Sequence, residues 1–266
     1  MKYIRTFNEN INNSEIEAIC KKYNITNYTI NEDVSIDVDG DVYLYNKKLK
    51  VLPLKFRKVS GNFDCNDNQL TTLEGAPQSV GGDFYCTSNQ LTSLVGCPQY
   101  IGGDFNCSFN KLTSLVGSPQ NIGGNFSCSF NELTSLKGSP QSIGGSFNCS
   151  CNQLTSLEGA PKRVSGLFLC NSNNLKNIDY LSKYYKELDI SNNPITKIIN
   201  LFTTSNEYGW ISNREDKELI MDFIYAEIIQ QDKLLVNRLV EFSHDIGKPK
   251  YKEELIELLK NDYEIR

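Results

Sequence analysis

One pattern of hydrophobic and polar positions recurs through the middle of the chain with a period of 21 residues. Each copy places Phe and Cys two residues apart, then Asn three residues after Cys, and then two aliphatic residues three apart. The Phe positions are Phe63, Phe84, Phe105, Phe126, Phe147 and Phe168. A fixed period of this length predicts a solenoid, in which each repeat buries its apolar face only by stacking on its neighbours.

The spacing within each repeat assigns a role to each segment. Residues two apart in a strand point to the same face, so Phe-x-Cys predicts a short strand with both side chains inward. The Asn that follows is expected to bond loop backbone groups that would otherwise be buried without partners. The two Leu of Leu-Thr-Ser-Leu point inward. Gly-x-Pro should cross the opposite side, and Val/Ile-Gly-Gly should return the chain to the next strand through tight or positive-φ turns.

The repeat extends beyond its consensus copies in both directions. Val42 and Leu44 lie 21 residues before Phe63 and Cys65, which indicates a degenerate first turn. The segment 188–195 should be the last turn. The sequence therefore predicts an N-terminal cap over residues 1–41, a solenoid over 42–199 and a C-terminal helical cap over 200–266.

The N-terminal cap is predicted to contain a helix and a hairpin. Ser14 and Glu17 have the spacing of a capping box, with the helix running to about Tyr23. The segments 28–30 and 34–38 are β-prone, and Asp39-Gly40 is a turn signal.

The chain changes character after the repeats. Residues 182–187 have a helical composition, and charge density rises past residue 200 while Gly and Pro thin out. Helices are predicted over 215–231, 234–244 and 251–259, the first with a broad apolar stripe. A cap that shields the open end of the solenoid is favoured over a separate docking module, because repeat arrays need capping to stay soluble.

The repeat F-x-C-x-x-N-x-L followed by L-T-S-L resembles the leucine-rich repeat, whose template is L-x-x-L-x-L-x-x-N-x-L. Phe and Cys stand at its second and third leucines, and residues 188–195 match the ordinary version more closely. This 21-residue variant is similar to tandem repeats in uncharacterised proteins of bacteria, tailed phages and large DNA viruses. The resemblance implies an α+β leucine-rich-repeat solenoid with a parallel β-sheet on its concave face. Family function carries over only as binding of another protein.

Composition narrows the range of partners and locations. A net charge of −5 argues against nucleic acid, whose phosphates require a basic face. No apolar run approaches the ~20 residues that cross a bilayer. The first residues lack the apolar stretch of a secretory signal, so a cytoplasmic protein is expected, in the host cytoplasm or the virion if it is viral. We expect a monomer with an unidentified protein partner.

Candidate chemistry in the sequence is sparse. The ladder of six Cys is expected to be reduced, because its side chains point inward side by side and the count of nine is odd. A metal site is disfavoured, since His244 is the one histidine and no CxxC pair is present. The acidic run 37–41 departs from a calcium loop in its Gly placement. His244 lies near Glu241 and Asp245, with Ser243 as the nearby nucleophile. We predict no catalysis, no metal and no cofactor.

The candidate functional surface is the concave face of the solenoid, where the residues that alternate with Phe and Cys point outward. Phe109 and Phe130 follow Cys by two residues on adjacent turns and are flanked by Lys111 and Glu132. They either cover backbone or form a binding hot spot, as exposed aromatics beside charges do. The predicted site comprises Asp83, Tyr85, Asp104, Asn106, Phe109, Lys111, Phe130 and Glu132.

These positions predict a non-enzymatic protein-interaction module. A structural or scaffold protein without a discrete ligand, including a component of a virion, is the alternative, and the near-identity of the repeats is compatible with it. A carbohydrate-binding surface made of Asn, Asp and Tyr85 is a weaker third hypothesis, because no row of aromatics accompanies it.

Overall fold

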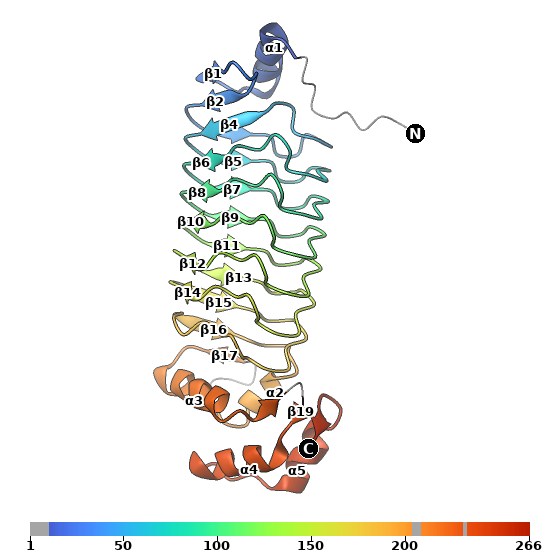
Figure 1. The fold of residues 1–266 in the computed structure, drawn as a ribbon, viewed down its shortest axis with the longest axis vertical. Coiled ribbons are helices and arrows are strands. Elements are labelled where there is room, and N and C mark those ends of the chain that lie inside the picture. Colours follow the sequence, from blue (N-terminus) through green and yellow to red (C-terminus); the bar gives the residue numbers. More distant parts are fainter. Residues whose placement is uncertain (1–10, 204–208, 231–232) are drawn as a thin grey trace, which may run out of the picture.

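The computed structural model describes residues 11–203, 209–230 and 233–266. Consecutive turns of the chain stack into an elongated column with the N-terminal helix at one end and the last helices at the other (Figure 1). Each consensus turn contributes two short strands, and equivalent strands 21 residues apart pair in parallel. The parallel-strand solenoid predicted from the repeat is confirmed.

The Phe-x-Cys segments form a sheet that we call the Phe sheet. Its order in the described part of the chain is β17-β16-β15-β13-β11-β9-β7-β5-β3. Neighbouring strands are in register, with Phe84 opposite Phe105 and Tyr85 opposite Asn106. The strands are β3 (Val42–Tyr43), β5 (Phe63–Asp64), β7 (Phe84–Tyr85), β9 (Phe105–Asn106), β11 (Phe126–Ser127), β13 (Phe147–Asn148), β15 (Leu167–Leu169), β16 (Glu187–Asp189) and β17 (Trp210–Ile211).

A second sheet runs along the column, which the sequence interpretation treated as a returning turn. Its order is β1-β2-β4-β6-β8-β10-β12-β14 within the described residues. We call it the Val/Ile sheet, because in the repeats its inward residue is Val or Ile. The strands are β1 (Tyr28–Ile30), β2 (Ile36–Val38), β4 (Phe56–Val59), β6 (Ser79–Val80), β8 (Tyr100–Ile101), β10 (Asn121–Ile122), β12 (Ser142–Ile143) and β14 (Arg163–Val164).

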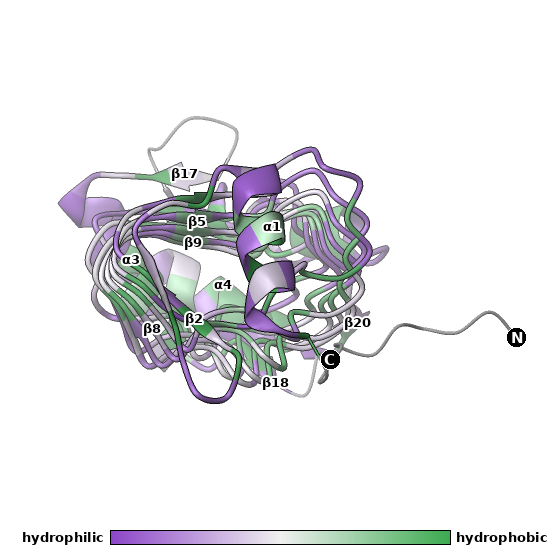
Figure 2. Ribbon diagram, turned by 90° about the horizontal axis from the view of Figure 1, so that it is seen from above, coloured by the Kyte–Doolittle hydropathy of each residue, from purple (hydrophilic) through white to green (hydrophobic). Residues whose placement is uncertain are grey.

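The two sheets enclose a core of stacked side chains. Seen from above, the strands of the two sheets lie on different sides of the column (Figure 2). The six consensus Phe are at most 1% exposed, and rings of adjacent turns are 5.1–5.9 Å apart between centroids. Burying each such side chain contributes about 1.5–3 kcal/mol. The core therefore has one equivalent layer for each turn.

The conserved spacing of Asn builds a second ladder along the same column. Asn131 donates from Nδ2 to the carbonyls of Cys107, Cys128 and Ser129 at 3.1, 3.1 and 3.2 Å. Its Oδ1 accepts the N–H of Leu112 from the preceding turn at 3.0 Å. The predicted role of Asn in satisfying buried loop backbone is confirmed.

Glycine serves two different purposes in the central turns of the array. Gly117, in Gly-x-Pro, has φ of +94°, which side chains other than glycine rarely adopt. The Gly-Gly pair is needed for close approach instead. A Cβ on Gly102 would lie 2.1 Å from the backbone oxygen of Gly81, one turn earlier. The expectation of tight geometry at Gly-Gly is confirmed, and the positive φ belongs to the other glycine.

The N-terminal cap contains the predicted helix and hairpin with different boundaries. Helix α1 spans Asn13–Tyr23, and its N-cap is Asn12 rather than Ser14. Asn12 Oδ1 accepts the N–H of Glu15 at 3.1 Å, and Glu15 accepts the N–H of Asn12 at 3.0 Å. The capping box is thus formed two residues earlier than predicted. Strands β1 and β2 pair antiparallel, and Asp39-Gly40 follows this hairpin rather than closing it.

Two helix predictions after the repeats are wrong in part. Residues 182–187 are not helical, because Tyr184 makes a parallel bridge with Arg163 and strand β16 starts at Glu187. The helix expected over 215–231 is α3, Arg214–Tyr225, and the chain leaves it through Glu227 at φ of +48°. Residue 231 lies outside the described residues. Pairing with the preceding turn overrides the helix propensity of residues 182–187, and the left-handed backbone conformation of Glu227 follows the end of α3.

The remaining C-terminal elements are short helices and a small sheet that the sequence did not predict. The sheet has the order β18-β19-β20 in the described residues. None of the helices among the described residues is long and apolar enough to cross a bilayer. The elements are α2 (Thr196–Ile199), β18 (Ile229–Gln230), β19 (Lys233–Leu234), α4 (Val236–Asp245), α5 (Lys252–Leu259) and β20 (Glu264–Ile265).

These elements dock on the last turn of the solenoid. Strand β17 pairs antiparallel with β16, and Trp210 Nε1 donates to the Glu187 carboxylate at 2.9 Å. The hydroxyl of Tyr263 donates to the carbonyl of Lys176 at 2.9 Å. Phe202 and Phe242 are buried with their ring centroids 5.4 Å apart. The apolar end of the stack is covered by these contacts.

Candidate interaction surface

The outer face of the Phe sheet carries a shallow polar depression of ≈ 370 Å³. Tyr85 and Asn106 lie opposite each other in β7 and β9 and contribute to it. Asp104, at the start of the same turn's strand, also lines it. The sequence placed these three residues on one surface, and the structure brings them together. The lining residues are Asn66, Tyr85, Thr87, Asp104, Phe105, Asn106, Asn125 and Ser127.

Asp83 and Asp104 belong to a hydrogen-bond ladder that the sequence analysis missed. The N–H of Asp104 donates to Asp83 Oδ1 at 2.7 Å, and the N–H of Asn125 donates to Asp104 Oδ1 at 2.7 Å. The ladder continues with Asn62 below and Asn125 above. The sequence did contain a signal for this ladder, because an Asp or Asn side chain that can accept a hydrogen bond directly precedes several of the strands. These carboxylates therefore hold adjacent turns together, besides lying at the edge of the depression.

Tyr85 is oriented by its neighbour on the same face. Its hydroxyl donates to Asp83 Oδ2 at 2.8 Å. Burial first, and then the hydrogen bond to the Asp83 carboxylate, raise the pKa of Tyr85 to about 12. The phenol is therefore neutral at physiological pH and serves as a fixed donor and an aromatic surface.

Phe109 and Phe130 form an exposed aromatic stack at the other end of the strands. Their rings are nearly parallel, with an interplanar angle of 8° and centroids 4.3 Å apart. The two side chains are 53% and 48% exposed. This pair is closer than any two adjacent Phe of the core. The stack therefore presents a continuous apolar surface across two turns.

The backbone of both Phe residues is in the left-handed region. Phe109 has φ of +55° and Phe130 has φ of +52°. Bulky residues rarely adopt this conformation, which favours Asn, Asp and Gly. The equivalent position in the other turns holds smaller residues with the same sign of φ: Asn46, Asp67, Ser88, Cys151, Ser172 and Asn192. Phe is therefore not what the backbone at this position prefers.

Charged and hydroxyl side chains surround the aromatic stack. Lys111 and Glu132 are exposed two residues after each Phe, and neither forms an ion pair with a described residue. On the strand side, Ser108 Oγ lies 2.8 Å from Ser127 Oγ and 3.0 Å from Ser129 Oγ. The hydroxyls satisfy one another, while the two charges remain available to a partner.

The eight predicted site residues thus fall into two groups on one sheet. Asp83, Tyr85, Asp104 and Asn106 lie at the depression and its edge, whereas the aromatic stack with its charges lies past the ends of the strands. Asp104 and Phe109 are five positions apart, which corresponds to roughly 16 Å along an extended chain. A protein-sized partner can cover both groups.

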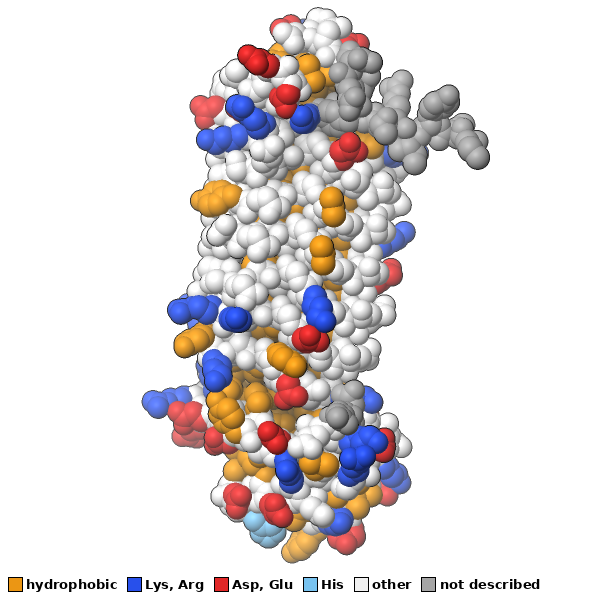
Figure 3. Space-filling view, viewed as in Figure 1, with side chains coloured by type: hydrophobic (Ala, Val, Ile, Leu, Met, Phe, Trp, Pro, Cys, Tyr) orange, Lys and Arg blue, Asp and Glu red, His pale blue; other side chains and the backbone are white. Residues whose placement is uncertain are grey.

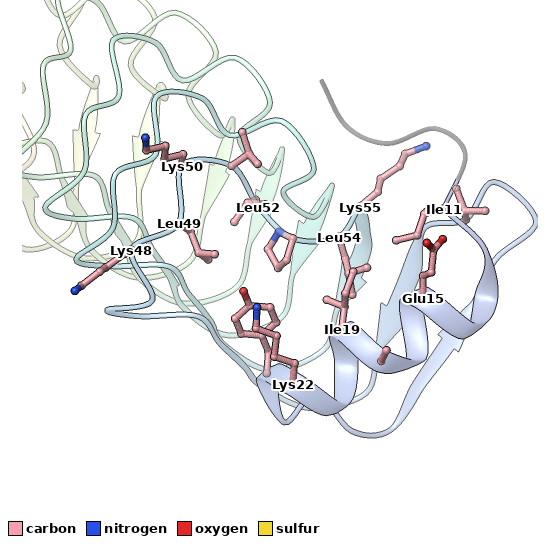
Figure 4. A pocket seen from close by; sticks show the side chains of 15 residues that line it. Ile11, Glu15, Ile19, Lys22, Lys48, Leu49, Lys50, Leu52, Leu54 and Lys55 are labelled. Atoms are coloured by element: carbon pink, nitrogen blue, oxygen red, sulfur yellow. The ribbon is translucent and has the colours of Figure 1, made fainter. Parts of the chain in front are cut away.

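A groove beside the N-terminal helix was not predicted. It has a volume of ≈ 620 Å³ and lies between α1 and the loop 48–55 (Figure 4). Ile19, Leu49 and Leu52 are among its apolar lining residues. Four lysines also line it, of which Lys55 is paired with Asp33 at 2.7 Å. Only the folded arrangement brings the helix and this loop together, so the sequence contained no local signal for the groove.

The cysteines offer no reactive site on this surface. All nine are free, and the six ladder thiols are completely buried. Burial raises the pKa of Cys107 and of the other ladder thiols well above the usual range. The thiols of Cys65 and Cys107 donate weakly to the carbonyls of Tyr85 and Ser127, at 3.3 and 3.4 Å. The interpretation of the ladder as reduced apolar filling agrees with this geometry.

The residues around His244 do not form a catalytic arrangement in the structure. Ser243 is buried, donates to the carbonyl of Val240 at 2.6 Å and accepts the N–H of Lys250 at 3.0 Å. His244 is exposed on the other side of α4. Among the described residues, no group of three or more His, Cys, Asp or Glu is placed to hold a metal ion.

Charge is distributed unevenly along the column. On the face shown in Figure 3, Lys, Arg, Asp and Glu side chains gather toward the two ends, and the middle turns carry few. Exposed apolar residues of the middle turns include Val95, Tyr100 and Val116. The middle turns therefore present a largely uncharged surface on this face.

No protein-family model matches the sequence, and no curated protein matches it. Among solved structures, the chain is similar to YopM from Yersinia enterocolitica WA-314, with 19% identity, 57% of this chain covered and a TM-score of 0.32. The match covers 47% of that protein, so the chain corresponds to about half its length. The stack of 21-residue turns with its parallel sheet and Asn ladder fits a leucine-rich-repeat protein on its own geometry.

Proposed function

We propose that this protein is a non-enzymatic protein-binding module whose partner contacts the outer face of the Phe sheet at the Phe109–Phe130 stack. Solenoids of this type commonly mediate protein–protein interaction. The observation that carries the proposal is a pair of half-exposed, stacked Phe residues in left-handed backbone positions, where the other turns have Asn, Asp, Ser or Cys.

The energetics favour a role in binding over a role in folding. A left-handed conformation costs a residue other than Gly, Asn or Asp about 1–2 kcal/mol. The contact between the two rings stabilises the folded chain by about 0.5–1.5 kcal/mol for the pair. Neither Phe therefore contributes much net stability to the monomer. Covering the exposed half of both rings by a partner would add about 1–3 kcal/mol of binding free energy.

Charge and shape define what the partner would meet. Lys111 and Glu132 flank the stack without an ion pair to a described residue, so they can set the orientation of a partner and make association sensitive to salt. The polar depression at Tyr85, Asp104 and Asn106 would lie toward the rim of the same contact. An apolar anchor with a polar rim is the usual anatomy of a protein interface.

The test is a comparison of two matched surface variants. A partner is captured with the wild-type chain, purified, and its dissociation constant measured by calorimetry. The double variant Phe109→Ser with Phe130→Ser should weaken binding by at least tenfold, and circular dichroism should show an intact fold, because Ser already occupies this position at Ser88 and Ser172.

Tyr100→Ser provides the control for loss of an aromatic residue. Tyr100 is 53% exposed on the Val/Ile sheet, away from the proposed surface, and its replacement should leave the affinity unchanged. Equal affinity of the Phe double variant and the wild type would refute the proposed site. Failure to find any partner, with the chain instead assembling as a component of a larger particle, would favour the structural alternative.

A further inference from the structure

The two ends of the Phe sheet are treated differently by the fold. At the C-terminal end, β17 turns back and pairs antiparallel with β16. At the N-terminal end the sheet finishes at β3, and no described residue pairs with the outer side of that strand. The Val/Ile sheet ends at the same side in β1, which pairs antiparallel with β2. The outer edge of β3 is therefore unpaired among the described residues.

The unpaired backbone groups of β3 can be identified from the pairing on its inner side. Val42 donates to the carbonyl of Asn62 at 2.8 Å, and Leu44 donates to the carbonyl of Asp64 at 2.7 Å. Because successive N–H groups of a strand point to opposite sides, those of Tyr43 and Tyr45 point away from β5. No described residue accepts a hydrogen bond from either. An open row of this kind is a template for another strand.

The apolar core behind this edge is already closed. Val42 and Leu44 are completely buried, although their strand is the last of the sheet. In the view from above, α1 crosses the end of the column beside the strands of the Phe sheet (Figure 2). An occupant would therefore find backbone donors and acceptors but no exposed core. This arrangement fits a single extended segment better than the apolar face of a folded domain.

The side chains beside the open edge are aromatic and acidic. Tyr43 and Tyr45 are 49% and 51% exposed, and the Tyr43 hydroxyl donates to Asp41 Oδ2 at 2.9 Å. Asp64 is directly opposite Tyr43 in β5. Neither Asp41 nor Asp64 forms an ion pair with a described residue. Lys47 lies over one of these rings, with its Nζ 5.8 Å from the Tyr45 ring centroid.

We propose that the open edge of β3 binds an extended, basic segment of a partner protein, which adds to the Phe sheet as a further strand. Residues alternate between the faces of a strand, so Lys or Arg at every second position would lie over the rings of Tyr43 and Tyr45 and near Asp41 and Asp64. A second copy of this chain would bring the same acidic stripe to the interface, so charge favours a basic partner. This site is separate from the Phe109–Phe130 stack.

Amide hydrogen exchange of the full chain, followed by NMR, provides the first test. In the free protein the amides of Tyr43 and Tyr45 should exchange fast, whereas those of Val42 and Leu44 should be protected. The probe is a blocked octapeptide of alternating Lys and Val, with alternating Glu and Val as its counterpart. The Lys peptide should protect Tyr43 and Tyr45, and the Glu peptide should not.

A proline substitution separates backbone pairing from side-chain contact. Tyr43→Pro removes one outward donor and leaves the N–H groups that pair with β5, so the fold should persist, as proline is tolerated on edge strands. It should weaken binding of the Lys peptide about tenfold or more. Tyr43→Thr keeps the donor and loses the ring, and it should retain more affinity than Tyr43→Pro. Added salt should weaken binding by the wild type.

Several outcomes would overturn the proposal. One is the absence of protection by the Lys peptide at millimolar concentration, and another is equal binding of both peptides. Slow exchange of the Tyr43 and Tyr45 amides in the absence of peptide would also overturn it. If this protection increases with protein concentration, the occupant of the edge is a second copy of the chain. If it does not depend on concentration, the occupant is the chain's own segment 1–10. The Phe109→Ser, Phe130→Ser variant should bind the Lys peptide normally, so failure here is distinct from failure of the proposed function.

Discussion

Asn110 holds Cys86 of the preceding turn through its side-chain amide, with Nδ2 donating to the Cys86 carbonyl at 3.0 Å. The same nitrogen donates to the carbonyls of Cys107 and Ser108, and Oδ1 accepts the N–H of Leu91 at 2.9 Å. One buried side chain thus satisfies four backbone groups of two turns. A contact of this kind, repeated along the column, couples each turn to the next.

Replacement of Asn110 by Ala should reduce the free energy of unfolding by about 3 kcal/mol, at the upper end of the range for a buried group left unpaired. Several backbone groups lose a partner at once, and water has little access to them. Thermal and urea unfolding measure the loss. Thr113→Ala, on the exposed part of the same turn, is the control and should cost less than about 0.5 kcal/mol. Equal effects of the two changes would show that the Asn ladder is dispensable.

Phe105 and Phe109 should differ sharply, although both are Phe in the same turn. Phe105→Ala removes a side chain that is 1% exposed and should cost about 3–5 kcal/mol. Phe109→Asn exchanges a strained, exposed Phe for a residue that tolerates its backbone, and should change stability by less than about 1 kcal/mol. Urea unfolding of the two variants compares them. A large loss in Phe109→Asn would mean that the stack serves the fold.

The two adjacent glycines of a turn should respond differently to the same added methyl group. A Cβ on Gly102 would meet the backbone oxygen of Gly81 at 2.1 Å, whereas one on Gly103 would meet Asp83 Oδ1 at 2.1 Å. A side chain moves away more easily than a stacked backbone, although Ser60 and Ser165 hold the equivalent of Gly102 in the first and last of these turns. In the middle of the array, Gly102→Ala should therefore destabilise by about 1–3 kcal/mol, and Gly103→Ala by less. Calorimetric melting of both variants provides the measurement, and the opposite order would contradict the close-packing argument.

The Cys ladder should make the protein sensitive to alkali. Burial raises the pKa of the ladder thiols, so above about pH 8.5 the unfolded chain loses protons that the folded chain keeps. Stability should be independent of these groups below that pH and fall above it, by up to about 1.4 kcal/mol per pH unit for each thiol. Urea unfolding between pH 7 and pH 10 measures the slope, and Cys107→Ala should make it shallower.

Thiol labelling gives an independent check on the same ladder. In the native protein, Cys151, which is partly exposed, should react before the six ladder thiols, and all nine should react after denaturation. Rapid native labelling of most ladder positions, or an alkaline slope unaffected by Cys107→Ala, would contradict the assignment of the thiols to a closed core.

Removal of the residues after Asn200 should expose the end of the solenoid. Strand β16 would lose its partner β17, and Ile198 and Ile199 would lose the cover of the C-terminal elements. The truncated chain should melt at a lower temperature and associate through the bared edge. Light scattering and thermal melting measure both effects. A monomeric truncated chain of unchanged stability would indicate that these elements form a separate module and not a cap.

The sequence predicted the solenoid, its inward Phe, Cys and Leu and the role of Asn, because each follows from a period repeated in one chain. It also placed Tyr85, Asp104 and Asn106 on one surface from their register beside Phe and Cys. It did not predict the second sheet, since strands of two residues leave no alternation to recognise. The Asp ladder was missed for a related reason. Asp83 accepts a hydrogen bond from a backbone N–H that is 21 residues away, and nothing next to Asp83 in the sequence indicates that its carboxylate has this partner.

Periodicity by itself therefore determined the architecture of the column, because identical turns can bury their apolar faces only against one another. Everything that depends on an interruption of the period was decided by the tertiary structure. Tertiary contacts put Phe109 and Phe130 in left-handed backbone positions, added the antiparallel strand β17 to one end of the Phe sheet, and left the outer edge of β3 without a partner among the described residues at the other. The physical reason is that pairing across turns fixes the backbone first, and the side chains at exceptional positions must accept the conformation that the stack imposes.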